Sequence, residues 1–215
     1  MEKIKLANGL IALGGRTDLR TTRFTLKYAN HLAKNERVLY VSYKLYKEKL
    51  ESLLSEIDEK INKNLELNTN FEHLGLTSFF QFYEKIRTDR IEVLIIDDIE
   101  YFCSANRDKN FSENYDPVLM LKHLSQLTNI KVMFITNTKR IYSCEYDADR
   151  PKLQDLWWSR NIINECTQIY ALHYPEVYGM LEDTDGNSLE HIVEVHHLKN
   201  ETNREEVFTF FDLVL

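Results

Sequence analysis

Proline and glycine, which form turns, and cysteine, which forms cross-links, are scarce in this protein. Its 215 residues include 3 prolines, 6 glycines and 3 cysteines. So few turn residues argue against a repetitive or low-complexity chain and against a flexible linker. The cysteines Cys103, Cys144 and Cys166 are odd in number and lack metal-ligand spacing, which predicts reduced, partly buried thiols. We therefore expect one domain over residues 1–215.

Long apolar runs and excess positive charge are also missing. No run of roughly 18 apolar residues occurs, which argues against a membrane span, and the first residues lack a signal-peptide hydrophobic segment. The 27 Lys and Arg stand against 34 Asp and Glu, a net charge of −7. This balance disfavours coating of nucleic acid through bulk charge but leaves local contacts open. We expect a cytoplasmic protein without membrane association.

What the chain does contain is a series of short apolar runs separated by amphipathic segments. The predicted buried strands are residues 9–13, 38–41, 93–98 and 132–135, and the predicted helices are 24–33, 45–61, 78–87 and 117–127. Residues 104–114 and 141–154 are polar and read as loops. This alternation predicts βαβ units, and hence an α/β fold with a mainly parallel sheet flanked by helices.

After residue 140 the pattern changes from alternating units to consecutive strands. A strand is expected at 168–172, antiparallel strands at 178–181, 192–197 and 207–211, and a turn at 185–187. We expect these strands to extend one edge of the parallel sheet.

The first predicted strand leads into a loop, GGRTDLRTT at residues 14–22, and then a helix. Proteins with a P-loop place phosphates here, with glycines for close backbone approach, a lysine for the phosphates and a hydroxyl for Mg²⁺. Thr22 supplies that hydroxyl, but Thr21 stands at the lysine position and Arg20 at the last glycine position. The arginines Arg16, Arg20 and Arg23 either bind an anion or lie solvated on an inert turn.

Several segments in the same order together resemble the motor domain of DnaB-type replicative helicases, which has a RecA-like P-loop fold. The matching segments are residues 9–16 with Phe24, VLYVSYKL at 38–45, IID at 95–97, VMFITNTKR at 132–140, RPKLQDL at 150–156 and ECTQI at 165–169. The resemblance covers nearly the whole chain. It implies a RecA-like fold without the family's N-terminal helicase domain.

The resemblance also implies which functional residues are kept and which are changed. Thr22 and Asp97 keep the positions that hold Mg²⁺, and Lys199 keeps a companion lysine. The phosphate lysine falls on Thr21, the water-polarising glutamate on Lys44, the sensor glutamine on Asn137 and the arginine finger near Glu201. A lysine cannot serve as the base at neutral pH, and a glutamate would repel the charge that an arginine finger stabilises. If nucleotide binds, the resemblance places it on Gly15, Arg16, Arg20, Thr21, Thr22, Arg23 and Asp97.

These departures predict a catalytically degenerate Walker A loop and a pseudo-ATPase that acts as a binding or assembly module in DNA replication or metabolism. The alternative is a divergent, active ATP-dependent DNA helicase, and a third reading is a structural protein without a ligand. We expect no cofactor, with weak binding of ATP and Mg²⁺ as the alternative. We also expect a protein partner or self-association, as a monomer or dimer, and leave single-stranded DNA open.

Other side chains suggest contacts with nucleic acid or protein. The adjacent tryptophans Trp157 and Trp158 have three alternative interpretations. They stack on bases, they anchor a protein partner, or they pack in the core. The cations for phosphate contact are Lys139, Arg140 and Arg150. His196 and His197 alternate faces of a strand, which predicts satisfied surface side chains and no metal site.

Overall fold

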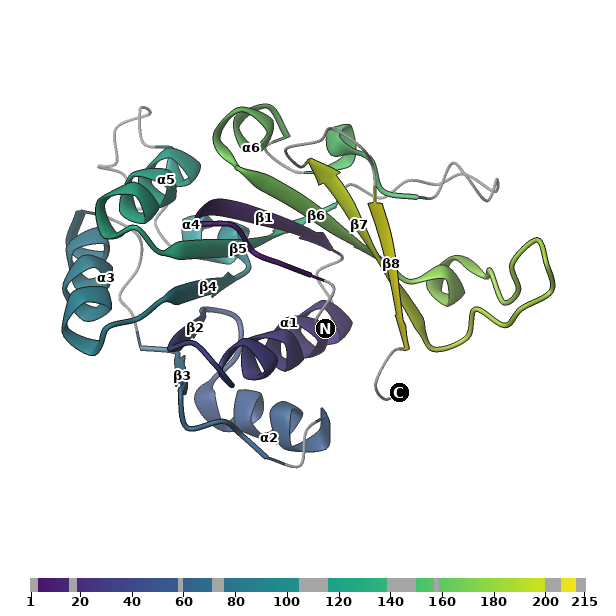
Figure 1. Ribbon diagram of the computed structural model, residues 1–215, viewed down its shortest axis with the longest axis horizontal. Coiled ribbons are helices and arrows are strands. Elements are labelled where there is room, and N and C mark those ends of the chain that lie inside the picture. Colours follow the sequence, from purple (N-terminus) through teal and green to yellow (C-terminus); the bar gives the residue numbers. More distant parts are fainter. Residues whose placement is uncertain are drawn as a thin grey trace.

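The computed structural model describes residues 4–15, 19–57, 60–70, 76–104, 116–138, 150–156, 159–199 and 206–211. Within them the strands form one eight-stranded sheet in the order β3-β2-β4-β5-β1-β6-β7-β8 (Figure 1). The strands are β1 (Gly9–Gly15), β2 (Val38–Ser42), β3 (Leu65–Asn68), β4 (Val93–Asp97), β5 (Lys131–Asn137), β6 (Gln168–His173), β7 (Ile192–Lys199) and β8 (Glu206–Phe211).

The pairing directions divide the sheet into two parts. Every neighbouring pair from β3 to β6 is parallel, whereas β7 pairs antiparallel with β6 and β8 antiparallel with β7. The prediction of a mainly parallel sheet extended by antiparallel strands near the C-terminus is confirmed.

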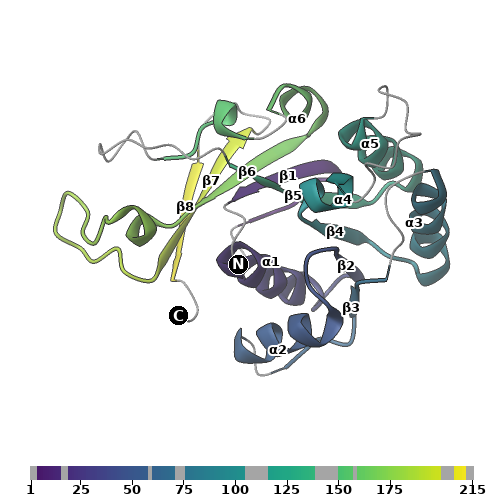
Figure 2. The same ribbon diagram turned by 180° about the vertical axis from the view of Figure 1, so that it is seen from behind.

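Helices cover both faces of the sheet (Figures 1 and 2). They are α1 (Leu19–Leu32), α2 (Lys47–Ile57), α3 (Leu76–Asp89), α4 (Ile99–Ser104), α5 (Pro117–Thr128) and α6 (Ser159–Glu165), with short 3-10 turns η1 (Leu153–Asp155) and η2 (Pro175–Tyr178). One core joins the sheet to α1 and α2, and a second joins it to α3, α4, α5 and α6. Strands buried on both faces account for the continuous apolar runs in the sequence.

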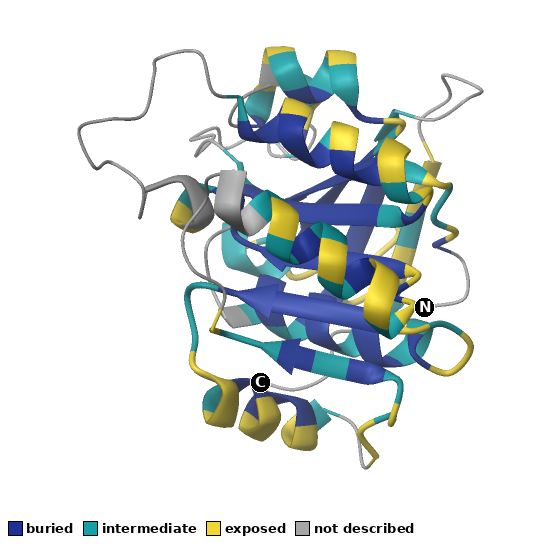
Figure 3. Cartoon of the chain, turned by 90° about the vertical axis from the view of Figure 1, so that its left-hand side faces the viewer, coloured by how far each residue is buried: buried dark blue, intermediate teal, exposed yellow. Residues whose placement is uncertain are grey.

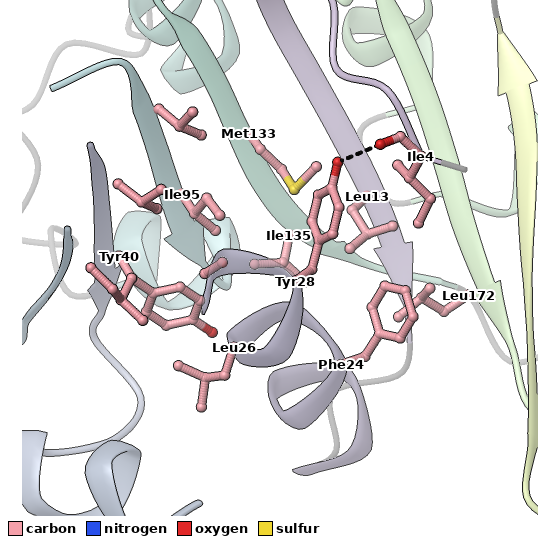
Figure 4. Close-up of a cluster of buried hydrophobic side chains, with 14 of the residues drawn as sticks. Ile4, Leu13, Phe24, Leu26, Tyr28, Tyr40, Ile95, Met133, Ile135 and Leu172 are labelled. Atoms are coloured by element: carbon pink, nitrogen blue, oxygen red, sulfur yellow. Dashed lines mark hydrogen bonds between the residues drawn. The ribbon is translucent and has the colours of Figure 1, made fainter. Parts of the chain in front are cut away.

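Burial follows this layering closely. The strands lie buried between the helices, whose exposed residues face outward (Figure 3). In the first core the ring of Tyr28 packs among aliphatic side chains, and its hydroxyl donates a hydrogen bond to the carbonyl oxygen of Ile4 at 3.0 Å (Figure 4). This bond fixes the segment before β1 against α1. No helix in the described part of the chain is long and apolar enough to cross a membrane.

Helix boundaries follow local chemistry where the caps are clear. The carboxylate of Asp116 accepts hydrogen bonds from the backbone nitrogens of Val118 and Leu119, Pro117 occupies the first turn of α5, and Asn129 ends it in the left-handed conformation. An Asp N-cap followed by proline is a strong helix-start signal, so α5 lies close to its predicted range.

Several elements differ from the prediction, among them helices α4 and α6, which were not predicted. No strand forms at 178–181, because Pro175 begins the 3-10 turn η2 and Gly179 ends it at φ 78°. The short strand β3 (Leu65–Asn68) was not predicted, since four residues alternating between buried and partly buried give little signal. The turn at 185–187 is confirmed, with Gly186 at φ 80°. Helix α2 ends its described range at Ile57, and residues 60–61 are not helical.

Candidate functional site

The candidate site lies where parallel strands end. Ser42, the last residue of β2, is in register with Asp97, the last residue of β4. Thr22, in the first turn of α1, donates a hydrogen bond from its hydroxyl to Asp97 Oδ2 at 3.3 Å. The carboxyl ends of parallel strands are where α/β proteins bind ligands. The structure therefore joins Thr22 and Asp97, the two side chains predicted to hold Mg²⁺.

Asp97 is a buried carboxylate surrounded by hydroxyl groups. Only 2% of its surface is exposed, and Oδ2 also accepts a hydrogen bond from Ser42 at 3.3 Å. Burial raises the pKa of Asp97 to about 6, and Asp98 adds to the rise. The charge of Lys44 and the hydrogen bonds from Ser42 and Tyr40 oppose it. Asp97 thus gains a proton at a much higher pH than an exposed aspartate.

A second layer of hydroxyls holds this arrangement in place. The hydroxyl of Tyr40 lies 3.1 Å from that of Thr25, which donates to the backbone carbonyls of Thr21 and Thr22 in α1. Both side chains are buried. The first turn of α1 is therefore tied to β2 through side chains as well as through the packing of the core.

The side chain of Thr21 fills space above the end of β1. It is 2% exposed, and a Cβ added at Gly15 would lie 2.8 Å from both Cγ2 and Oγ1 of Thr21. That distance is shorter than real Cβ contacts, so the absence of a side chain at Gly15 gives Thr21 its room. Thr21 here packs inward against the backbone of Gly15.

The arginines near this loop have carboxylate partners. Arg20 Nη1 lies 2.5 Å from Glu176 Oε1 in η2, and its guanidinium lies 5.9 Å from the centre of the Tyr174 ring. Arg23 Nη2 lies 2.7 Å from Glu56 Oε2 in α2. These two positions are thus occupied in ion pairs, while Arg16 lies outside the described residues.

A second carboxyl group lies beside the end of β5. Glu100 Oε1 accepts hydrogen bonds from the Thr136 hydroxyl at 2.6 Å and from the backbone nitrogen of Asn137 at 3.2 Å. Burial, together with Asp98, raises the pKa of Glu100 to about 7. Asp98 caps α4 by accepting hydrogen bonds from the backbone nitrogens of Glu100 and Tyr101.

Other predicted residues lie in the antiparallel part or outside the described chain. Lys199 donates hydrogen bonds to the carbonyl oxygens of Ile163 and Cys166, at 2.7 and 2.6 Å, at the end of α6. Arg150 Nη2 lies 3.6 Å from Glu194 Oε1 on β7. The predicted residues outside the described ranges are Arg16, Lys139, Arg140, Trp157, Trp158 and Glu201.

The histidines of β7 alternate faces as predicted, but the expectation that they lie on the surface is wrong. His196 is 0% exposed and bonds Glu194 at 3.0 Å, while His197 is 6% exposed and stacks on Tyr170 at 4.1 Å. The ring of Tyr170 lies against His197, and His173 and Glu194 lie against His196, which accounts for their burial. Within the described ranges, no group of three or more His, Cys, Asp or Glu side chains could hold a metal ion.

Sequence reasoning missed three residues around the site: Tyr40, Ser42 and Glu100. A signal existed for Ser42, because it ends its strand as Asp97 does, and neighbouring parallel strands bring such residues together. Tyr40 lies within an apolar run and reads as core. Glu100 follows two aspartates, and its contact with Thr136 depends on the direction of α4.

Comparison with known proteins gives a likeness of fold. No protein-family model and no curated protein matches the sequence. A solved DnaB-like replicative helicase, described with its interactions with primase, has a TM-score of 0.68 at 17% identity over 95% of this chain. The ATPase domain of a second protein has a TM-score of 0.72 at 15% identity, over 96% of this chain and 82% of that one.

The fold is that of RecA-like helicase ATPase domains, with the mixed, mainly parallel sheet that those structures have. More particularly, it resembles the ATPase domain of DnaB-like replicative helicases. This chain spans 54% of the length of the first of these structures.

Proposed function

We propose that this chain is a helicase-like RecA-fold domain with a degenerate Walker A loop, which does not hydrolyse ATP and acts as a binding or assembly module in DNA replication or metabolism. The observation that carries the proposal is that groups of the protein itself already hydrogen-bond the carboxylate of Asp97. Hydroxyls of Thr22, Ser42 and Tyr40 bond this carboxylate, and the charge of Lys44 acts on it. A Mg²⁺ ion at Asp97 would have to compete with these hydroxyl groups for the carboxylate oxygens.

The phosphate loop supports the same proposal. A P-loop enzyme needs a cation that reaches the transferred phosphate, and this electrostatic contribution is a large part of its catalysis. Thr21 carries no charge and packs on Gly15, while Arg20 and Arg23 are paired with Glu176 and Glu56. To stabilise a phosphate, either arginine must leave a carboxylate partner.

One set of observations favours the alternative, a divergent ATPase. The 3.3 Å approach of the Thr22 hydroxyl to Asp97 is compatible with a shared Mg²⁺ ion. Glu100 of α4 has a pKa of about 7 and contacts the end of β5, and a base with that pKa is well matched to proton transfer near neutral pH.

Calorimetric titration with ATP and ADP in the presence of Mg²⁺ separates the two functions. The pseudo-ATPase predicts no saturable binding up to about 1 mM nucleotide, a concentration that corresponds to roughly 4 kcal/mol of binding free energy. A divergent ATPase predicts binding that Asp97→Ala abolishes. The triple variant R20G/T21K/K44E, which supplies the missing glycine, lysine and glutamate, is expected to gain binding, and R20G/T21K/K47E is its charge-matched control, since Lys47 is exposed on α2.

A further inference from the structure

The two edges of the eight-stranded sheet, β3 and β8, differ in how far they are protected from pairing with another chain. Strand β3 has four residues, its two leucines are buried, and Glu66 pairs with Lys85 of α3 at 2.8 Å. Short length and charged side chains are common ways in which proteins prevent an edge strand from pairing with a neighbour. The β3 edge is therefore protected.

The β8 edge, at the far end of the sheet from β3 (Figure 1), lacks these features. Strand β8 has six residues, EVFTFF, with neither lysine nor proline among them. Val207 is 45% exposed, and Thr209 is also exposed. Within the described residues β8 pairs with β7 alone, so the N–H and C=O groups on its outer edge bond no other described strand. Such a row of backbone groups is a template for one more strand.

The inner side of β8 is anchored to the rest of the domain. Phe208 and Phe210 lie opposite Val195 and Val193 of β7, and both pack against the first core. The ring of Phe210 also makes an edge-to-face contact with Phe24 of α1, at 6.2 Å between ring centres. Both phenylalanines of β8 are only partly buried. A strand added beside β8 would therefore cover apolar surface as well as backbone groups.

We infer that β8 pairs antiparallel with the β8 of a second copy of this chain, about a two-fold axis at Thr209. In this register Phe208 of each copy lies opposite Phe210 of the other, and the two Thr209 residues face each other. The sequence Phe-Thr-Phe at 208–210 reads the same in both directions, so one strand is complementary to itself, as a two-fold contact requires. Aromatic side chains that pair across strands stabilise such a contact.

The size and charge of this contact set its strength. Two short strands bury less than the roughly 1,200 Å² of a standard protein interface, so we expect a weak dimer with a dissociation constant on the order of 10–100 µM. Each copy has a net charge of −7, so the copies repel one another in dilute buffer. Salt screens that repulsion, and the dimer is expected to tighten as salt is raised from about 50 to 500 mM.

This inference rests on the assembly role in the proposed function and names the partner as a second copy. A row of backbone donors and acceptors selects a strand, whereas a nucleic acid would bring phosphates to a chain of net negative charge. The contact does not depend on whether the domain hydrolyses ATP, because β6 and β7 separate β8 from β1 and the phosphate loop that follows it.

Sedimentation velocity over about 5–500 µM protein tests the dimer. Val207→Lys places a charged side chain on the open edge, where lysine commonly prevents pairing, and is expected to weaken the dimer at least about ten-fold. Leu127→Lys is the matched control, because Leu127 is an exposed aliphatic residue of α5 and the change of net charge is the same. It is expected to change the dissociation constant less than about two-fold. Circular dichroism checks that both variants fold.

A cross-link tests the register without weakening the strand. Thr209→Cys places two cysteines opposite each other across the two-fold axis, where the Cβ atoms of paired strands lie roughly 4.5–5.5 Å apart. Mild oxidation at a protein concentration above the dissociation constant is expected to convert most of this variant to a covalent dimer. The controls are the wild type, which has the same other cysteines, and Thr88→Cys at an exposed position of α3. Both are expected to form little covalent dimer.

Three results would overturn the inference: a protein that stays monomeric up to about 500 µM, equal weakening of the dimer by Val207→Lys and Leu127→Lys, or equal cross-linking of Thr209→Cys and Thr88→Cys. Turnover of ATP would overturn the proposed loss of hydrolysis and leave a positive dimer result standing. A monomeric protein would remove this interface and leave the absence of hydrolysis untouched.

Discussion

The parallel and the antiparallel parts of the sheet each bury a carboxylate, yet they shift its pKa in opposite directions. Asp97, at the end of β4, is 2% exposed and its pKa is raised to about 6. Glu194, on β7, is 6% exposed and its pKa is lowered. Neutral hydroxyls bond the first, whereas His196 bonds the second and Arg150 lies near it. Burial alone therefore does not decide whether a buried acid is charged; its bonded partners do.

The difference bears on where each part of the molecule gains stability. At the ends of the parallel strands, hydroxyl groups bond the buried Asp97 without offsetting the cost of its burial, so its pKa stays raised. In the antiparallel part, Lys199 of β7 donates two hydrogen bonds to carbonyl oxygens at the end of α6, and Glu176, which precedes β7, pairs with Arg20 of α1. We expect substitutions in the second part to destabilise the fold, and neutralisation of Asp97 to stabilise it.

The largest expected effect is at Lys199. Lys199→Met removes two charge-assisted hydrogen bonds to the end of α6 and leaves the carbonyl oxygens of Ile163 and Cys166 without that donor. The free energy of unfolding is expected to fall by about 2–3 kcal/mol in urea titration. Lys47→Met, at an exposed position with one distant ion pair, is the control and should change it by less than about 0.5 kcal/mol. An equal fall in the free energy of unfolding for both substitutions would contradict the structural role of Lys199.

The next largest effect is an increase in the free energy of unfolding, on neutralising Asp97. Folding raises the pKa of Asp97 from 3.8 to about 6, so the folded state holds this proton more tightly than the unfolded state. Its contribution to stability is complete below pH 3.8 and is lost as pH rises through about 6. Asp97→Asn is therefore expected to stabilise the protein by roughly 2 kcal/mol at neutral pH.

The pH dependence of that gain identifies its cause. Thermal melts of the wild type and of Asp97→Asn should differ near pH 7.5 and converge near pH 4, about two units either side of the raised pKa. A gain that is independent of pH would mean that packing, and not charge, sets the difference. A loss of stability at neutral pH would contradict the account of Asp97.

The smallest expected effect is at the ion pair between α1 and η2. Arg20 and Glu176 have side chains that are 32% and 13% exposed, so solvent screens much of their attraction. A double-mutant cycle with Arg20→Gln and Glu176→Gln is expected to give a coupling of about 0.5–1 kcal/mol that decreases in high salt. A coupling near zero would leave Arg20 available to a phosphate, which favours the divergent ATPase.

Much of the fold could be predicted from the hydrophobic pattern of the sequence, whereas much of the candidate site could not. The runs at 38–41, 93–98 and 132–135 are apolar on both faces, which only a covered parallel sheet explains. The chain around Gly179 was misread because a proline-initiated turn and a strand both tolerate its residues. The hydroxyls of Tyr40 and Ser42 converge on Asp97 only through strand register, and Glu194 meets Arg150 across more than forty residues of sequence. Such contacts have no local signature.

The most direct test is a phosphate-release assay with ATP, Mg²⁺ and single-stranded DNA, comparing the wild type with Asp97→Ala. The loss of a phosphate lysine and of a base at position 44 predicts that the wild type releases phosphate no faster than the variant. Mg²⁺-dependent turnover that Asp97→Ala abolishes would contradict the account, and would assign catalysis to other groups, with Lys44 and Glu100 the first to examine.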